Sequence, residues 1–557
     1  MTDSIRHICS SIWRASEPDR SSGAEFLCDA VIHILREHPD RGELLRQRDV
    51  YRLQKLLPPG RLAELYDEMC RAGVYLHHYT LMQIATSLAK EPSLKRRALD
   101  ILVVGLSRLK NEPEGERLDE MRRGRWASVF TTILHTSYAK VPRNSSVPTR
   151  SDVPAPDEIW EVALENGLEP NEIQITALVD SLFAVGRGDA AWQVFDMFME
   201  ERKMPVPLKL ASTLLHGSRM TGNLPHMQRA LAILAETGEM DAVLGNDILH
   251  LVLRFALADS TKVFSSFRLM QRLYSRMFKS EALDALIPEK LRGVVDPDTS
   301  LEDMMLFPGF ASHLEKLFAA QKGMLMEPTV ATLEVMVLSW ICSLKQGFKG
   351  PALIAFYGHY RGMLKQRHPV AVGIVEAKNS IIHDMIIKGM GTSSTHLRSA
   401  LEVIGDMLRD HEEPTQPSGR VRGSASGEEA RKAEPVHPRP TTWTWNILLG
   451  AWLQHFKQES VGRIISLMKK HGVEPTIVTW NTILSRAAAR NNTHLAVEAA
   501  RGIRDGGFEA DEWTVNAFSR LRSKETFFYE MQQRAKRSGT GPARKGGRPK
   551  IADDRGG

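Results

Sequence analysis

The sequence predicts an all-α fold, a right-handed α-solenoid of stacked antiparallel helix pairs. Three asparagines, Asn446, Asn481 and Asn516, are spaced 35 residues apart, and the residues around them repeat as well. An apolar run follows each asparagine, and Gly472 and Gly507 keep the same 35-residue period. A fixed period in this range indicates helical units that cannot bury their apolar faces alone and therefore stack on their neighbours.

Each repeat is predicted to contain two helices. In the second helix of one repeat, over 459–470, Val461 and Ile464 lie on one face at helical spacing. Gly472 then suits the left-handed conformation that often ends a helix, and Pro475 prevents the helix from continuing.

The recurring asparagine needs an explanation because asparagine is a mediocre helix former. One interpretation is that it caps the first helix of the repeat by bonding free backbone N–H groups. The other is that Thr444 and Thr479, which are closer to the helix start, act as the caps. In that case the asparagines are free to face outward.

The C-terminal block resembles the pentatricopeptide repeat (PPR) family. Thr-Trp-Asn at 444–446 and at 479–481 takes the place of the usual Thr-Tyr-Asn, and Gly-Val-Glu-Pro at 472–475 matches the closing motif. The related tetratricopeptide repeats, which bind proteins, have a period of about 34 residues. The resemblance is specific over 442–516 and weaker elsewhere.

Residues 1–41 are predicted to form an N-terminal leader with some features of a targeting segment. Ile5, Ile8 and Ile12 have helical spacing and arginines lie among them. Asp3 and Glu17 weigh against this interpretation, because transit peptides avoid acids. A solvated leader is the alternative.

A degenerate helical-repeat solenoid is predicted over 42–410. Thr176, Ala211 and Asn246 continue the 35-residue step, and an apolar helix is expected after each of them. Proline-rich stretches at 141–155 and 279–325 are predicted to interrupt or bend the array.

The C-terminal third is predicted to contain three further segments. Residues 411–440 include five prolines and are predicted to be a linker that separates the rest of the chain from C-terminal repeats at 441–533. Residues 534–557 are predicted to be a basic, disordered tail, able to contact phosphates without regard to sequence.

Composition excludes several classes of protein. The chain has 557 residues, 42% of them hydrophobic, and a net charge of +6, which permits nucleic acid as a partner without requiring it. Its four cysteines have no metal-site or disulfide spacing and suit a reducing compartment. We find no membrane-spanning run and no catalytic, phosphate-loop or zinc motif, so neither an enzyme, a metal site nor a cofactor is expected.

The resemblance implies that each repeat contacts one base of single-stranded RNA through two or three side chains. In the family the fifth residue bonds the base edge, the last residue assists, and the second packs on the base face. The clearest unit is 477–511, where Val478, Asn481 and Asp511 occupy these positions; the resemblance associates that polar pair with uracil. The full predicted RNA-contacting set is Trp443, Asn446, Thr476, Val478, Asn481, Asp511, Trp513, Asn516, Asn246 and Thr176.

Other repeats depart from the family pattern. The combination of Trp443, Asn446 and Thr476 is that of a pyrimidine-tolerant unit, and Trp443, like Trp513, is expected to stack more strongly than the usual aliphatic residue. Ala211 offers no polar group at the fifth position, so a long contiguous RNA readout is not expected.

Two hypotheses follow. The first is a single-stranded RNA-binding protein acting in mitochondrial RNA stability, processing or translation, with protein partners also allowed. The alternative is a protein-interaction scaffold in a mitochondrial ribosomal or translation-activating assembly, with little direct RNA contact. Lysines and arginines beside the first-helix asparagines favour the first hypothesis, and a continuous apolar stripe favours the second.

Overall fold

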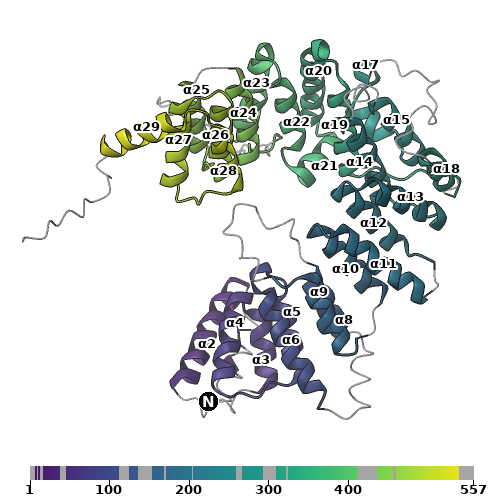
Figure 1. The fold of residues 1–557 in the computed structure, drawn as a ribbon, viewed down its shortest axis with the longest axis vertical. Helices are drawn as coiled ribbons and strands as arrows, with labels where there is room; N and C mark the ends of the chain where they lie inside the picture. Colours follow the sequence, from purple (N-terminus) through teal and green to yellow (C-terminus); the bar gives the residue numbers. More distant parts are fainter. Residues whose placement is uncertain are drawn as a thin grey trace, which may run out of the picture. The chain divides into compact units, whose positions relative to one another are not determined.

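The structure is a computed structural model that describes most of the chain (Figure 1). The described residues are 7–8, 11–12, 17–37, 46–111, 125–135, 153–168, 171–202, 205–258, 266–292, 309–320, 324–411, 436–455 and 459–537. Within these ranges the regular structure is helical, apart from one isolated parallel bridge between Phe278 and Met326. The predicted all-α fold of paired, stacked helices is confirmed.

The chain forms two compact units. The first contains Met1–Asp247 and Leu301–Met324, and the second contains Ile248–Ser300 and Leu325–Gly557. Helices of the first unit are α2 (Glu17–Glu37), α3 (Gln47–Leu56), α4 (Pro59–Arg71), α5 (His78–Leu88), η2 (Pro92–Leu94), α6 (Lys95–Leu109), α8 (Arg125–Leu134), α9 (Pro156–Glu165), α10 (Glu172–Ala184), α11 (Gly188–Arg202), α12 (Leu208–Thr221), α13 (Leu224–Thr237) and α18 (Phe310–Ala320).

Helix α14 (Ala242–Ala258) begins in the first unit and ends in the second. Helices of the second unit are α15 (Ser266–Met277), α16 (Glu281–Leu286), α17 (Glu289–Arg292), α19 (Val330–Ser343), α20 (Gln346–Lys365), α21 (Pro369–Lys378), α22 (Ile381–Met390), η5 (Ser394–His396), α23 (Leu397–Arg409), α24 (Thr442–His455), α25 (Glu459–Lys470), α26 (Ile477–Ala489), α27 (Thr493–Asp505), α28 (Glu512–Ser519) and α29 (Lys524–Arg537).

The repeat period appears in space as a row of packed first helices within each unit. In the second unit, α24, α26 and α28 pack on one another as first helices, and the second helices α27 and α29 pack on each other. In the first unit, α8, α10 and α12 stack in the same way. Gly472 and Gly507 have φ angles of +74° and +68°, so the predicted left-handed helix ends are confirmed.

The predicted leader at 1–41 is wrong for most of its length, because α2 occupies 17–37 and packs on α4. Leu27, Val31 and Leu35 are buried at helical spacing against the neighbouring helices. The helical array therefore begins well before residue 42.

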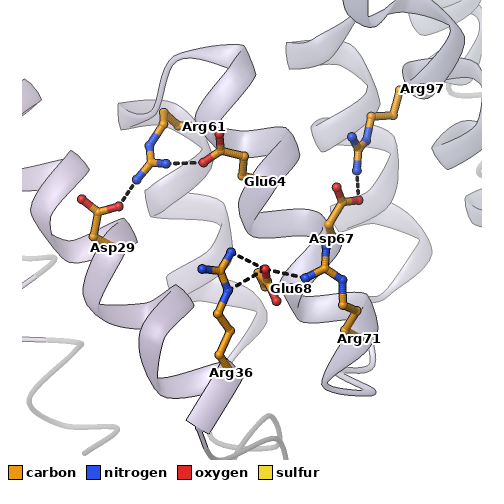
Figure 2. A network of polar contacts seen from close by, with 8 residues as sticks. All are labelled: Asp29, Arg36, Arg61, Glu64, Asp67, Glu68, Arg71 and Arg97. Carbon is orange, nitrogen blue, oxygen red and sulfur yellow. Dashed lines mark hydrogen bonds and ion pairs between the residues drawn. The ribbon is translucent and has the colours of Figure 1, made fainter. Parts of the chain in front are cut away.

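Ion pairs also tie α2 to α4 (Figure 2). Arg61 pairs with Asp29 of α2, and the buried Glu68 of α4 accepts hydrogen bonds from Arg36 of α2 and from Arg71. Hydrogen bonds from Arg36 outweigh burial, so the pKa of Glu68 lies below its usual range. The carboxylate consequently stays charged and paired at neutral pH.

The predicted separation of the C-terminal repeats by a linker at 411–440 is also wrong. Helix α24 packs directly on α22, so the stack continues across this stretch. The backbone N–H groups of Val436 and His437 donate to Asp410 at 3.1 and 2.9 Å, which fixes the segment just before α24. Residues 412–435 lie outside the described residues.

The two other predicted interruptions have different outcomes. The stretch at 141–155 lies almost wholly outside the described residues. At 279–325 the regular period is lost as predicted: α16 and α17 are short, and α18 packs on α13. At Met326 the chain contacts the end of α15, because the Met326 backbone N–H donates to the Met277 carbonyl at 2.9 Å.

The basic tail begins later than predicted, because α29 extends to Arg537. Arg534 lies 3.5 Å from Glu498 of α27, so at least this first residue of the predicted tail belongs to the folded stack. Residues 538–557 lie outside the described residues.

The structure adds one fact about the cysteines and one about membrane-spanning helices. Cys28, Cys70 and Cys342 are free thiols, and Cys9 lies outside the described residues. Among the described residues, every helix is too short or too polar to cross a membrane.

A buried histidine pair joins α22 to the segment before α24. His383 is fully buried, and its Nε2 lies 3.1 Å from Nδ1 of His437. Burial, with a smaller effect from His437, lowers the pKa of His383 to about 3. The opposite shift occurs next to it, where burial raises the pKa of Asp384 to about 6.

We expect acid to weaken this junction. The pKa of His383 is lower in the folded protein than in the unfolded chain, so its contribution is complete above about pH 6.5 and falls by up to about 1.4 kcal/mol per pH unit below it. Asp384 opposes this trend, because its raised pKa favours the folded state as the pH falls through about 6. Urea unfolding of His383→Gln between pH 7 and 5 should show a flatter pH dependence than the parent, and Asp384→Asn a steeper one. Equal slopes in all three proteins would contradict the assignment.

Candidate RNA-binding face

The first helices of the C-terminal repeats all begin with a capping pair. Thr444 and its N-cap Thr441 exchange backbone-to-side-chain hydrogen bonds at 3.1 and 3.2 Å. At the next helix, the backbone N–H of Thr476 donates to Thr479 at 3.1 Å. Thr444 and Thr479 therefore take part in capping as the N3 residues of capping boxes, whereas the N-cap residues themselves lie three positions earlier.

The third first helix, α28, is capped by Asp511. The carboxylate Oδ1 of Asp511 accepts from the Thr514 backbone N–H at 2.7 Å, and the Asp511 N–H donates to the Thr514 hydroxyl at 3.3 Å. In this arrangement the last residue of one repeat is the N-cap of the next first helix. The asparagines are not caps, because they lie one turn inside their helices.

Asn481 and Asp511 are brought together as predicted. The Asn481 Nδ2 donates to Asp511 Oδ1 at 2.9 Å, and the Thr514 hydroxyl lies 2.8 Å from both Asn481 Oδ1 and Asp511 Oδ1. Residues 30 positions apart in sequence thus form one polar cluster at the junction of two repeats. We call Asn481, Asp511 and Thr514 the amide–carboxylate cluster.

The cluster favours an ionised carboxylate. Partial burial alone would raise the pKa of Asp511, but hydrogen bonds from Thr514 and Asn481 together outweigh it, and the pKa lies below its usual range. One N–H of the Asn481 amide and the second oxygen of the carboxylate are not used within the cluster. Both groups are half-buried, so a donor and an acceptor are available side by side.

Asn446 is placed differently from Asn481. It is only 7% exposed, and its Oδ1 has no hydrogen-bond partner among the described residues. Thr476, which is the last residue of the same repeat and the N-cap of α26, is half-buried. The expectation that all the recurring asparagines face outward is therefore wrong for Asn446, whereas Asn516 is exposed on α28.

The second position of the first helices is apolar and exposed. Trp443 is 58% exposed and Trp513 66%, and in the first unit Ile173 and Val243 at the equivalent position are 70% and 54% exposed. Val478 is half-buried. Exposed large apolar side chains thus recur at the second repeat position within each unit.

Comparison with known proteins shows which part of the chain is similar to the pentatricopeptide repeat family. The sequence model of the pentatricopeptide repeat domain matches residues 436–490. The match covers α24, α25 and α26; we call the C-terminal repeats at 441–533, which contain most of the matched residues, the PPR segment. No curated protein matches the chain in sequence.

Solved structures of PPR proteins align with the chain at low sequence identity and low TM-score. The crystal structure of the pentatricopeptide repeat protein PPR10 from maize aligns over 95% of this chain and 80% of its own, at 13% identity and a TM-score of 0.28. A structure of PPR10 in complex with an 18-nt psaJ RNA element aligns over the same shares at 14% identity and a TM-score of 0.27. Such scores do not place residues of this chain on residues of those proteins.

The first unit has a groove at the position that the PPR segment uses for its amide–carboxylate cluster. Helices α8, α10, α12 and α14 line a cavity of about 440 Å³ that includes Ile173, Thr176 and Val243. Acidic and basic groups both line it: Glu172, Asp180, Lys209, His216 and Asp247. The groove is therefore neither uniformly basic nor a continuous apolar stripe.

The predicted polar positions of the first unit are less suited to bonding a base than those of the PPR segment. The Thr176 hydroxyl donates to the Glu172 carbonyl at 2.7 Å, so its proton is already used. Ala211 is fully buried, and Asn246 is half-buried on α14. No group of three or more His, Cys, Asp or Glu side chains among the described residues could hold a metal ion.

Sequence reasoning missed Thr514 as the third member of the cluster. The signal was present, because a polar cap followed three residues later by a polar side chain is the signature of a capping box. Asp511-x-x-Thr514 fits that signature in the sequence. Its role in holding Asn481 was not visible, because that contact joins neighbouring repeats.

Proposed function

We propose that the C-terminal PPRs bind single-stranded RNA and that the amide–carboxylate cluster contacts one base edge. The observation that supports this most directly is the 2.9 Å hydrogen bond between Asn481 and Asp511. It holds a primary amide and a charged carboxylate side by side, and it leaves a donor and an acceptor unused. A base edge offers complementary acceptors and donors at similar spacing.

The exposed aromatic residues supply the second component of such a site. Trp443 and Trp513 belong to the repeats before and after the cluster, and more than half of each side chain is exposed. Bases stack on aromatic faces with about 1–3 kcal/mol per base, independently of sequence. Stacking therefore provides affinity, while the cluster provides selectivity at one nucleotide.

The first unit supports the alternative role of a protein-interaction scaffold. Its fifth-position groups are a buried alanine, a threonine bonded to its own helix, and a half-buried asparagine. With mixed charge in the groove, this unit has little means of distinguishing bases. We accordingly propose that RNA reading is confined to the PPR segment and that the first unit binds a protein partner.

Crosslinking of RNA to the full chain, followed by sequencing and peptide mapping, tests this division. Crosslinks should concentrate on peptides of α24, α26 and α28, with Trp443 and Trp513 the expected sites of attachment. Crosslinks that fall chiefly on α10 and α12 would contradict it. A chain that binds no single-stranded RNA would remove the RNA-binding proposal and leave the scaffold role alone.

We further propose that the protein acts in mitochondria, in RNA stability, processing or translation. The family's habitual location and the arginines and isoleucines of residues 1–14 support this proposal. Because α2 begins at Glu17, deletion of residues 1–16 spares that helix, whereas deletion of 1–20 would remove part of it. We expect a fluorescent fusion of the full chain to be mitochondrial and the 1–16 deletion to be dispersed. A full-length fusion that stays cytosolic or nuclear would contradict the location.

A further inference from the structure

The first unit contains a second cavity at the start of α6, which adjoins the groove described above and shares Thr131, His135 and Ile173 with it. It has a volume of about 420 Å³ and lies where α5, α6, α8 and α10 meet. Its polar lining includes Lys90, Lys95, Ser128, His135 and Asn171. None of the described residues that line it is an aspartate or a glutamate.

Lys95 is a buried cation that has no carboxylate partner among the residues that the structure describes. It is 2% exposed, and its Nζ donates to the carbonyl oxygens of Ile133 and His135 at 3.1 and 3.0 Å. A lysine ammonium has three N–H donors, so these two bonds leave one N–H that the described residues do not use. Burial lowers the pKa of Lys95 to about 8.

The next two residues in the sequence, Arg96 and Arg97, differ from Lys95 because each is paired with a carboxylate. Lys95, Arg96 and Arg97 are consecutive cations in the first turn of α6, where the helix dipole disfavours positive charge. Arg96 bonds Glu158 at 2.9 Å, and Arg97 is paired with Asp67. Of the three, only Lys95 has carbonyl oxygens in place of a carboxylate, and it is the one that lines the cavity.

We propose that this cavity binds a phosphate group. A phosphate oxygen can accept from the unused N–H of Lys95 while its other oxygens accept from Lys90 and from the Nδ2 of Asn171. The Asn171 Oδ1 already accepts from the Gln174 N–H, so its Nδ2 is the group left for a ligand. The phosphate belongs either to a free phosphorylated compound or to the backbone of a bound RNA strand.

Thermal unfolding of the full chain with inorganic pyrophosphate tests the site without any need for RNA. Ionic strength is held constant with potassium chloride. At a pyrophosphate concentration about fifty times Kd, mass action predicts a Tm rise of about 2–4 °C. Lys90→Gln, at an exposed position, should fold normally and lose most of that rise, and Lys95→Met should lose it as well. Lys110→Gln removes a comparable exposed charge at the end of α6 and should keep it.

The outcomes separate this inference from the proposed function. The phosphate site is overturned if pyrophosphate does not raise the Tm of the parent, or if it raises the Tm of Lys90→Gln and Lys95→Met as much as that of the parent. In either case Lys95 serves only to cap the end of α8. If the rise is lost as expected, RNA titrations in several salt concentrations identify the source of the phosphate. For a backbone phosphate, each lysine removed lowers the salt slope by about 0.7, relative to Lys110→Gln. An unchanged slope, or no RNA binding at all, assigns the site to a free phosphorylated ligand.

Discussion

Replacing Trp445 with alanine is expected to lower the free energy of unfolding by about 3–5 kcal/mol, whereas the same change at Trp443 should have little effect. The two residues lie two positions apart on α24, but Trp445 is 1% exposed and Trp443 is 58% exposed. Removal of the buried indole leaves a cavity between packed helices. Its N–H has no partner among the described residues, so no hydrogen bond is lost.

Urea denaturation followed by circular dichroism measures the difference between the two variants. Hydrogen exchange of α24 and α26 then shows whether the loss is local, since repeat arrays can open at one interface. The pair is matched in residue type, helix and chemical change, so burial alone distinguishes the two sites. Similar midpoints for both variants would contradict the assignment of Trp445 to the core. Trp443→Ala should instead weaken RNA binding, because its exposed ring is available for stacking.

The 35-residue period was sufficient to predict those features of the fold that depend on residues close together in the sequence. Glycines at 472 and 507 and the caps of α24, α26 and α28 recur because each repeat needs the same helix ends. The α2 helix was not predicted, although Leu27, Val31 and Leu35 have helical spacing, because the leader was inferred from the isoleucines and arginines of residues 1–14.

Other features could not be predicted because they depend on contacts between distant residues. His437 follows a proline-rich stretch, and nothing local indicates that it lies against His383, 54 positions earlier. Asn446 and Asn481 occupy the same repeat position, yet one is buried and the other is half-buried and bonded to the next cap. The residue at that cap differs: Asp511 accepts from the amide of Asn481, whereas no hydrogen bond joins Asn446 to Thr476 among the bonds described.

This difference changes which substitutions can separate RNA reading from folding. Asp511 is the N-cap of α28, so Asp511→Ala is expected to lower the free energy of unfolding by about 0.5–2 kcal/mol whatever its role in binding. Asp511→Ala therefore cannot separate RNA binding from folding. Asp511→Asn is the better variant, because asparagine is an equally good N-cap, while its amide replaces the charge and one acceptor oxygen by an N–H donor.

We expect Asn481→Ala to weaken binding of the preferred single-stranded RNA by about 1–3 kcal/mol, taking the scale of a bidentate base contact in DNA. The loss should fall on one nucleotide position, and other bases should then be tolerated there. Asp511→Asn should change the preferred base at the same position while keeping the melting temperature, since the bond from Asn481 and the cap can both remain. The measurement is a titration on RNAs varied at one position, alongside a melting curve for each protein.

Truncation after Arg537 is the contrasting control, because it removes basic residues that are not part of α29. Loss of sequence-independent phosphate contacts should reduce affinity for every RNA in the panel and flatten the salt dependence, with the base preference unchanged. If Asn481→Ala instead behaves like the truncation, the cluster contributes charge or shape and does not read a base. If it melts normally and binds every RNA as the parent does, Asn481 has no part in RNA recognition, and its bond to Asp511 serves only to join two repeats.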